Sequence, residues 1–312
     1  MLKLLVAILL LGFALPAAAQ TTGEEPTKEM LAKDNQLFLT LARQALHWDE
    51  PTEPFHIVGP LYYVGTRGLG AYLFVTSDGL ILLNTGMPES GPLIAASISQ
   101  LGFYPPDIEL LINSHAHVDH AGALAYMKDL SGATLALMEG DVAPMEDGGK
   151  SDFQYGADWQ VMGWPPVAVN RVLHDGDRVA LGEVSLTALS TPGHTRGSTT
   201  WVTELVQDGK VYLVVFPDGA DLNPGYRIMQ DPSYPGIEGD YRRTHHRLEM
   251  LKPDIWLTAH PELSLMEEKR ERAKTEGVAA WVDPEGYRLW VWKEKREFEA
   301  LVNEEMGVTV PE

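Results

Sequence analysis

Cysteine is absent from the 312-residue sequence, and basic residues are scarce. Without cysteine the chain can form no disulfide bond and offers no cysteine for a lipid anchor, so its stability has to come largely from packing. The sequence holds 24 Lys and Arg against 44 Asp and Glu, a formal net charge of −20 at pH 7. Such an acidic chain repels a phosphate backbone, which argues against nucleic acid as substrate or partner.

Long hydrophobic runs are also missing, except for one near the N-terminus. The apolar run 4–15 follows Lys3 and precedes Ala17-Ala18-Ala19, the pattern of a secretory signal peptide. This run is too short to cross a bilayer comfortably, and no other segment approaches the roughly 20 residues that a spanning helix needs. We therefore expect residues 1–19 to be a signal peptide, and the mature chain to be periplasmic or secreted with no membrane span.

Apolar periodicity and turn residues predict alternating strands and helices along the rest of the chain. In the first half we expect helices at 31–46, 91–101 and 121–130, and strands at 55–58, 61–64, 71–76, 80–84, 108–112 and 134–138. In the second half we expect strands at 178–180, 183–189, 199–206, 210–216 and 255–258, and helices near 239–251 and from Asp283 onward.

Two strand-rich halves with helices outside them predict an α/β fold. The expected architecture is an αβ/βα four-layer sandwich, in which two mixed β-sheets pack together between outer helices and share a functional edge. No linker with a shift in composition divides the halves, so we expect residues 20–312 to form a single domain.

Three histidines and one aspartate occur within six residues, in the stretch His115-Ala116-His117-Val118-Asp119-His120. The stretch follows the predicted strand 108–112, and the carboxyl ends of strands are where open α/β sheets place their sites. His115 and His117 alternate as on an extended chain and can face one point, whereas Asp119 and His120 follow the turn and can face a second. Nitrogen and oxygen donors at this density suit a borderline cation such as Zn²⁺. Five other histidines lie in no such pattern: His47, His56, His174, His245 and His246.

The HxHxDH stretch resembles the signature of the metallo-β-lactamase fold superfamily. Two later histidines each follow or end an apolar run at a predicted strand terminus, as this superfamily would need. They occur in Thr191-Pro192-Gly193-His194 and Leu257-Thr258-Ala259-His260. Further stretches narrow the resemblance to subclass B3 of the metallo-β-lactamases: Thr199-Thr200-Trp201, Asn223-Pro224-Gly225-Tyr226-Arg227 and Asp240-Tyr241-Arg242-Arg243. The resemblance runs from about Trp48 to the C-terminal helix.

The resemblance implies two zinc ions per chain. The first would be held by His115, His117 and His194, and the second by Asp119, His120 and His260. It also implies that a metal-bound hydroxide attacks the carbonyl carbon of a β-lactam, with Asp119 as the catalytic residue that orients the hydroxide and relays its proton. The expected substrates are small-molecule β-lactams (penicillins, cephalosporins and carbapenems), and the oligomeric state is left open.

Three positions depart from the pattern of the family. Asn84 stands where many relatives have an aspartate. Because its side chain is neutral, we expect weaker support of the metal loop, the loop that carries the HxHxDH stretch. Asp218 and Asp221 lie where many relatives have serines that contact the substrate carboxylate. We expect Asp221 and Asn223 to contact the substrate, with the charge of Asp221 opposing an anionic drug. Alternatively, Asp218 or Asp221 bridges two metals, as an aspartate does in glyoxalase-II-like and lactonase-like members.

Three functions are compatible with these residues: a periplasmic zinc β-lactamase, another di-metal hydrolase of the same fold (a lactonase, thioesterase or phosphodiesterase), and a binding protein with a vestigial site. The signal peptide favours the β-lactamase, the acidic charge disfavours a nuclease, and six intact ligands disfavour the binding protein. The irregular segment 147–166, with its aromatic residues, predicts either a plain surface loop or a flap over the site.

Overall fold

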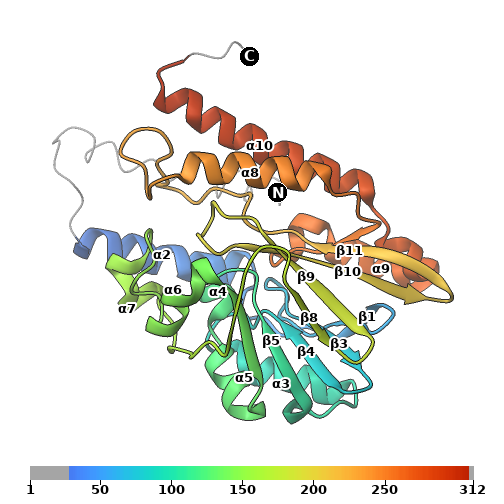
Figure 1. The fold of residues 1–312 in the computed structure, drawn as a ribbon. Coiled ribbons are helices and arrows are strands. Elements are labelled where there is room, and N and C mark those ends of the chain that lie inside the picture. Colours follow the sequence, from blue (N-terminus) through green and yellow to red (C-terminus); the bar gives the residue numbers. More distant parts are fainter. Residues whose placement is uncertain (1–27, 309–312) are drawn as a thin grey trace.

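The computed structural model describes residues 28–308, so the signal peptide predicted at 1–19 lies outside the described residues. Two mixed β-sheets pack face to face, with helices on both outer faces (Figure 1). Among the described residues, no helix combines the length and the apolar character that a membrane crossing requires.

The first sheet contains seven strands, in the order in which they occur in the chain. They are β1 Phe55–Val58, β2 Leu61–Tyr63, β3 Tyr72–Thr76, β4 Gly79–Leu83, β5 Ile108–Ile112, β6 Thr134–Met138 and β7 Arg171–Leu173. Strands β1 to β4 pair antiparallel, and β4 to β7 pair parallel. Parallel strands need crossover connections, and α3 (Ser90–Gln100) and α5 (Leu124–Ser131) provide two of them.

The second sheet contains five strands in the order β12-β11-β10-β9-β8. They are β8 Arg178–Leu181, β9 Val184–Ser190, β10 Thr199–Gln207, β11 Lys210–Phe216 and β12 Ile255–Trp256. Strands β8 to β11 pair antiparallel, and β12 lies parallel to β11. Asp208 and Gly209 join β10 to β11 with φ of 52° and 77°, which is the left-handed conformation that a two-residue hairpin turn of type I′ requires.

The central core lies between the two sheets. Tyr72 and Phe74 of the first sheet contact Phe216 of the second, with ring centroids 4.9 and 5.8 Å apart. Because side chains alternate along a strand, β9 buries Val184, Leu186 and Ala188 on one face while its other residues are half-buried. Burial of this apolar surface is the main favourable contribution to folding.

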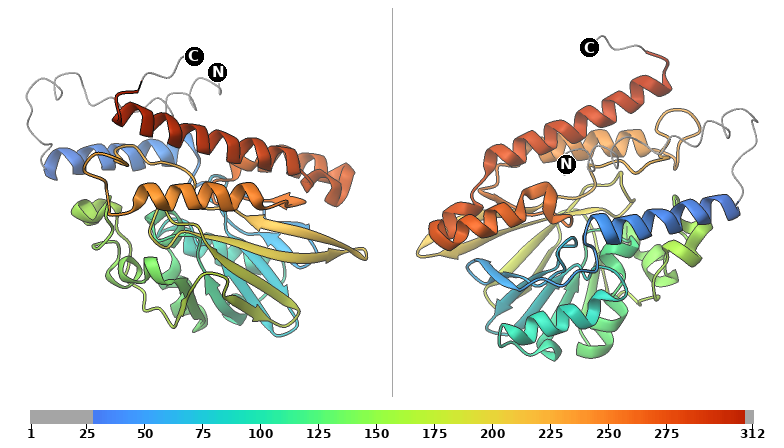
Figure 2. Two further views of the ribbon diagram at one scale, coloured as in Figure 1. Left: turned by 45° about the horizontal axis from the view of Figure 1, so that its top comes forward. Right: turned by 180° about the vertical axis from the view of Figure 1, so that it is seen from behind.

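Helices complete the two outer layers (Figure 2). On the first sheet, α3 and α5 bury apolar side chains against the outer face, as α2 (Lys28–Ala45) and α6 (Val142–Asp147) do near the site. On the second sheet, α8 (Ile237–Met250) and α10 (Pro284–Glu305) pack against Val215 and Trp256. The αβ/βα sandwich expected from the sequence is therefore confirmed.

The helix predicted at 121–130 is wrong in its start and in its continuity. A short helix, α4 (Val118–Ala121), begins inside the HxHxDH stretch, and α5 begins only at Leu124. The break falls at Gly122, where an added Cβ would lie 2.4 to 2.5 Å from the backbone of Met87 and Pro88. The chain passes so close there that only glycine fits.

Several elements were not predicted, the short helix α6 among them. Strand β7 has only three residues, too few for a visible alternation. Helix α9 (Met266–Glu276) is polar almost all round and buries only Met266 and Lys269, so it lacks the apolar stripe on which helix prediction depends.

Asp283 is expected to be a large single contribution to stability in the outer layer. It begins α10 by accepting a hydrogen bond from the Gly286 amide at 2.9 Å, and it lies 2.9 Å from the ammonium of Lys269, which is 3% exposed. The substitution Asp283→Ala would leave that ammonium buried without its carboxylate. It should lower the free energy of unfolding by about 3 kcal/mol, measured by urea denaturation of metal-free protein.

The matched control is Glu285→Ala, two residues along in the first turn of the same helix. Glu285 pairs with Arg288 on the surface, with both side chains 65% exposed, and exposed pairs contribute little. Equal losses in the two variants would contradict the assigned role of Asp283.

Candidate metal centre

The carboxyl ends of strands from both sheets meet at one edge of the molecule. Strands β4, β5 and β6 run in the same direction in the first sheet, as β9, β11 and β12 do in the second. The loops that follow β5, β9, β11 and β12 carry the histidines and aspartates predicted to form the site: His115, His117, Asp119, His120, His194, Asp218, Asp221 and His260.

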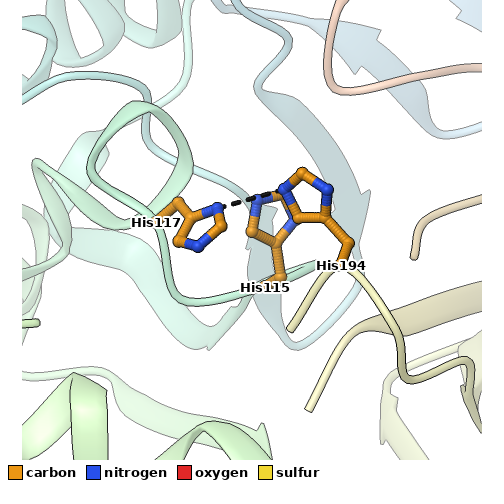
Figure 3. Close-up of side chains that lie close together, drawn as sticks. All are labelled: His115, His117 and His194. Atoms are coloured by element: carbon orange, nitrogen blue, oxygen red, sulfur yellow. Dashed lines mark hydrogen bonds between the residues drawn. The ribbon is translucent and has the colours of Figure 1, made fainter. Parts of the chain in front are cut away.

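His115, His117 and His194 form the first group, which we call the three-histidine group (Figure 3). Each side chain is buried, and one ring nitrogen from each lies within 4.8 Å of the other two. His117 Nδ1 is 3.1 Å from His194 Nε2. Two nitrogens bound tetrahedrally to one zinc at about 2.0 to 2.1 Å would lie about 3.3 Å apart, so this spacing fits a shared cation.

Asp119 is the centre of the second group. Its Oδ2 lies 3.3 Å from His120 Nε2 and 3.5 Å from His260 Nε2. His115 joins Asp119 and His120 in a set of donor atoms within 4.8 Å of one another. The two groups therefore adjoin, and the structure brings together all six residues predicted as ligands.

Each member of the three-histidine group has a carboxylate beside one ring nitrogen. The Nδ1 of His115 is 2.9 and 3.0 Å from the two carboxylate oxygens of Asp218. The Nδ1 of His194 is 3.1 Å from Asp221 Oδ2, and the Nε2 of His117 is 3.6 Å from Asp152 Oδ2. A carboxylate in this position orients a ligating imidazole and selects its tautomer.

Burial and charge together set the pKa values here. Burial lowers the pKa of His115 well below its ordinary value and raises the pKa of Asp218 to about 7. Burial also disfavours a charged His194, but the Asp221 carboxylate outweighs it and raises the pKa of His194 to about 10. Asp119 is likewise buried, yet His120 and His260 beside it hold its pKa below the ordinary value.

The donor set fits a cation. When the carboxylate of Asp218 accepts the Nδ1–H of His115, the Nε2 of that ring carries a lone pair, and this nitrogen is buried without a hydrogen-bond partner in the described residues. A buried polar atom without a partner is costly unless a ligand satisfies it. Imidazole nitrogens and one carboxylate, with no thiolate, are a donor set that zinc accepts.

Asp141 and Asn84 fix the loop that carries the first two histidines. Asp141 accepts hydrogen bonds from the Ala116 amide at 2.7 Å, the Thr195 hydroxyl at 2.8 Å and the Gly197 amide at 2.8 Å. Asn84 has a φ of 62°, accepts from the Ser114 amide at 2.8 Å and donates to the Ser114 hydroxyl at 3.2 Å. The neutral residue that departs from the family pattern therefore holds the metal loop through both ends of its amide.

A pocket opens beside the two groups. Its walls come from α2, from the segment 149–164, and from the loops after β11 and β12; the lining includes Phe38, Trp48, Asp152, Tyr155, Trp164, Asp221, Asn223 and His260. Asp221 and Asn223 line it, whereas Asp218 does not, and the contact of the first two with a substrate stays a prediction. Neither Asp218 nor Asp221 belongs to a candidate metal group among the described residues, and neither does His260, so both roles of the two aspartates stay predictions.

The aromatic residues of segment 147–166, which was predicted to be a surface loop or a flap, differ in whether they line the pocket. Tyr155 and Trp164 line the pocket, in agreement with the flap interpretation. Phe153 packs instead against Tyr226 and Tyr234, with ring centroids 5.4 and 4.7 Å apart. Trp159 is 41% exposed and lies outside the lining.

Sequence reasoning missed Asp152 and Asp141. Their partners, His117 and Ala116, lie 35 and 25 residues earlier in the chain, so no local spacing connects them. The only weak indication of Asp152 in the sequence was its position in the irregular segment 147–166. In the structure its Oδ1 accepts hydrogen bonds from the amides of Gln154 and Tyr155 and forms an Asx turn.

Comparison with known proteins agrees with this geometry. Residues 69–206 match the family model of the metallo-beta-lactamase superfamily. The native FEZ-1 metallo-beta-lactamase from Legionella gormanii is 38% identical with a TM-score of 0.80, and the match covers 82% of this chain and 98% of that one. The chain belongs to the metallo-β-lactamase superfamily.

Two further relatives extend the comparison. BJP-1, a subclass B3 metallo-beta-lactamase of Bradyrhizobium japonicum, is 34% identical with a TM-score of 0.78, and the match covers 83% of this chain and 97% of that one. The resemblance to subclass B3 is thereby confirmed. An acyl-coenzyme A thioesterase of Gallus gallus is 32% identical over 28% of this chain and 35% of its own. The chain thus spans well under half the length of the first curated relatives that it matches.

Asp141→Ala should destabilise this metallo-β-lactamase-fold protein in its metal-free form. The change would leave three buried donors without their acceptor, and each buried donor without a partner costs about 1 to 3 kcal/mol. We expect the free energy of unfolding to fall by at least about 3 kcal/mol in urea denaturation. Glu139→Ala, in the same turn but on the surface, is the control and should change it little; a similarly small loss for Asp141→Ala would contradict the role assigned to Asp141.

Proposed function

We propose that this protein is a zinc-dependent β-lactamase that hydrolyses the amide bond of penicillins, cephalosporins and carbapenems. The observation that carries the proposal is the match to FEZ-1 over nearly its whole length, together with the six donor side chains at the shared edge. We propose a periplasmic or secreted location on the N-terminal pattern of the sequence alone.

His115, His117 and His194 would hold one zinc ion, and Asp119, His120 and His260 a second. When bound, such cations polarise a carbonyl group and lower the pKa of a coordinated water. Hydrolysis adds the water oxygen to the carbonyl carbon, breaks the C–N bond and places a proton on the nitrogen. The carboxylate of Asp119, only 13% exposed beside His120 and His260, is positioned to orient the attacking water and to carry its proton to the leaving nitrogen.

The charges and polarity of the pocket lining determine which substrate groups can bind there. Asp119, Asp152 and Asp221 are among its lining residues, and no Lys or Arg is. The partners that we propose for an anionic β-lactam are Asn223, whose Nδ2 lies 3.5 Å from His194 Nε2, and the cations that the histidines would hold. The aromatic side chains of Trp48, Tyr155 and Trp164 offer apolar surface for the rest of the molecule.

Purified protein should contain close to two zinc ions per chain and should hydrolyse a carbapenem. Dialysis against a chelator should abolish hydrolysis, and added Zn²⁺ should restore it, because the buried Nε2 of His115 has no hydrogen-bond partner among the described residues that could take the place of a cation. Elemental analysis and the absorbance change on ring opening measure the two quantities. One ion per chain at saturating zinc would contradict the two-site assignment.

A thioesterase is the second candidate, on the strength of the match to the acyl-coenzyme A thioesterase. The same preparation should therefore be offered an acyl thioester and a lactone. Hydrolysis of either at a kcat/KM well above that for every β-lactam tested, with two zinc ions bound, would replace the β-lactamase proposal by a di-metal hydrolase of different specificity.

Asn223→Ala should raise the KM for β-lactams by about 10-fold or more while changing kcat less. The loss corresponds to one hydrogen bond to a charged group, about 1.5 to 3 kcal/mol. A nitrophenyl ester without a carboxylate is the matched control substrate, and its KM should be unchanged. An equal rise for both substrates would mean that Asn223 shapes the pocket rather than meeting the carboxylate.

A further inference from the structure

The three carboxylates beside the three-histidine group distinguish it from its neighbour. Asp218 faces His115, Asp152 faces His117 and Asp221 faces His194, with closest N–O distances of 2.9, 3.6 and 3.1 Å. Asp152 and Asp218 are buried, so water screens little of their charge. In each pair the carboxylate lies on the ring nitrogen that does not face the centre of the group.

The second group has no comparable support among the described residues. His120 is 1% exposed, and its Nδ1 is buried without a hydrogen-bond partner, as is also true of the Nε2 of His117. The ring of His260 stacks on the indole of Trp48, with centroids 5.7 Å apart, and among the described residues its one ion pair within 4 Å is with Asp119, itself a member of the group. The side chain of His260 is also the most exposed of the five histidines, at 26%.

We infer that Asp152, Asp218 and Asp221 are positioning residues that make the three-histidine group the tight zinc site, filled first, and leave the Asp119, His120 and His260 group to fill at higher zinc. The inference rests on the ligand assignment of the proposed function and not on its substrate. The Asp218 carboxylate is within hydrogen-bond distance of the outer nitrogen of His115, where it can orient the ring and increase the basicity of the inner nitrogen. The outer nitrogen of His194 faces both the carboxylate and the backbone carbonyl of Asp221, at 3.1 and 3.2 Å, and Asp152 acts on His117 through its charge at 3.6 Å. Three such pairs also place negative charge around one divalent cation.

The first experiment separates the two sites. In competition with a chromophoric chelator, His260→Ala should bind one zinc as tightly as the tight step of the wild type, and His194→Ala should bind its remaining zinc at least 10-fold more weakly. The reverse order would overturn the proposal.

The second experiment tests the carboxylates within the His260→Ala background. Asp152→Asn, Asp218→Asn and Asp221→Asn keep the size of the side chain and remove its charge. Each should weaken zinc binding by about 10-fold to 100-fold. Asp158→Asn is the matched control, because Asp158 is a buried carboxylate in the same segment as Asp152 that accepts from Asn35 at 3.0 Å. Affinities within twofold of the background for all three variants would contradict the proposal.

Two measurements distinguish a local effect on zinc binding from a general loss of protein stability. The thermal stability of each metal-free variant should change no more than that of Asp158→Asn, since a general loosening of the fold would lower it together with the zinc affinity. In wild-type protein labelled at histidine, the first equivalent of Zn²⁺ should shift the ring resonances of His115, His117 and His194 before those of His120 and His260. Simultaneous shifts would overturn the filling order. Neither readout needs a substrate, so failure of β-lactam hydrolysis leaves this test intact.

Discussion

Asp141 is the constraint on which the geometry of the site depends. Its carboxylate joins the loop after β5 to the loop after β9, through the amides of Ala116 and Gly197 and the hydroxyl of Thr195. The loops approach so closely that an added Cβ at Gly197 would lie 2.3 to 2.6 Å from Asp141, so the sequence needs glycine there. Because the two loops belong to different sheets, this one side chain ties the sheets together at their functional edge. His115 and His117 are thereby held opposite His194 by the protein itself, and the ligands need little rearrangement to meet a cation.

The outer helix α8 holds the other side of the site. Although it belongs to the layer behind the second sheet, its buried face carries polar groups that reach the loops: the Tyr241 hydroxyl donates to the Asp221 carbonyl at 2.9 Å, and the Thr244 hydroxyl donates to the Pro192 carbonyl at 2.7 Å. His245, which lies in no ligand pattern, is 3.1 Å from the Ala220 carbonyl through its Nε2. These contacts provide hydrogen bonds to loop carbonyls, and the Asp221 carbonyl also lies 3.2 Å from His194 Nδ1, so they help to set where Asp221 meets His194.

The features that could be predicted from the sequence are those formed by residues that lie close together in the chain. Apart from the helix predicted at 121–130, strands and helices with an apolar period were located to within three residues, and the HxHxDH stretch predicted four ligands because its donors lie within six residues. His194 and His260 came only from the resemblance to the family. Asp218 is 103 residues from His115, and its pairing with that ring follows from the meeting of the carboxyl ends of β5 and β11 at the shared edge rather than from any local pattern. Helix α9 was missed for the opposite reason: its polar sequence carries no period, and packing at Met266 and Lys269 holds it in place.

Some carboxylates that lie beside the three-histidine group also affect how the pocket binds an anionic substrate. Asp152 and Asp221 are the carboxylates that support the three-histidine group, and both also line the pocket, where no Lys or Arg stands among the lining residues. The positive potential that would attract an anionic substrate must therefore come from the bound cations themselves. In the proposed enzyme, loss of the less supported ion would then have two consequences, since it would remove both a Lewis acid and the main partner of the substrate carboxylate. In a relative with a neutral residue in place of Asp221, the pocket would repel such a substrate less, and occupancy of the second site would matter less for binding.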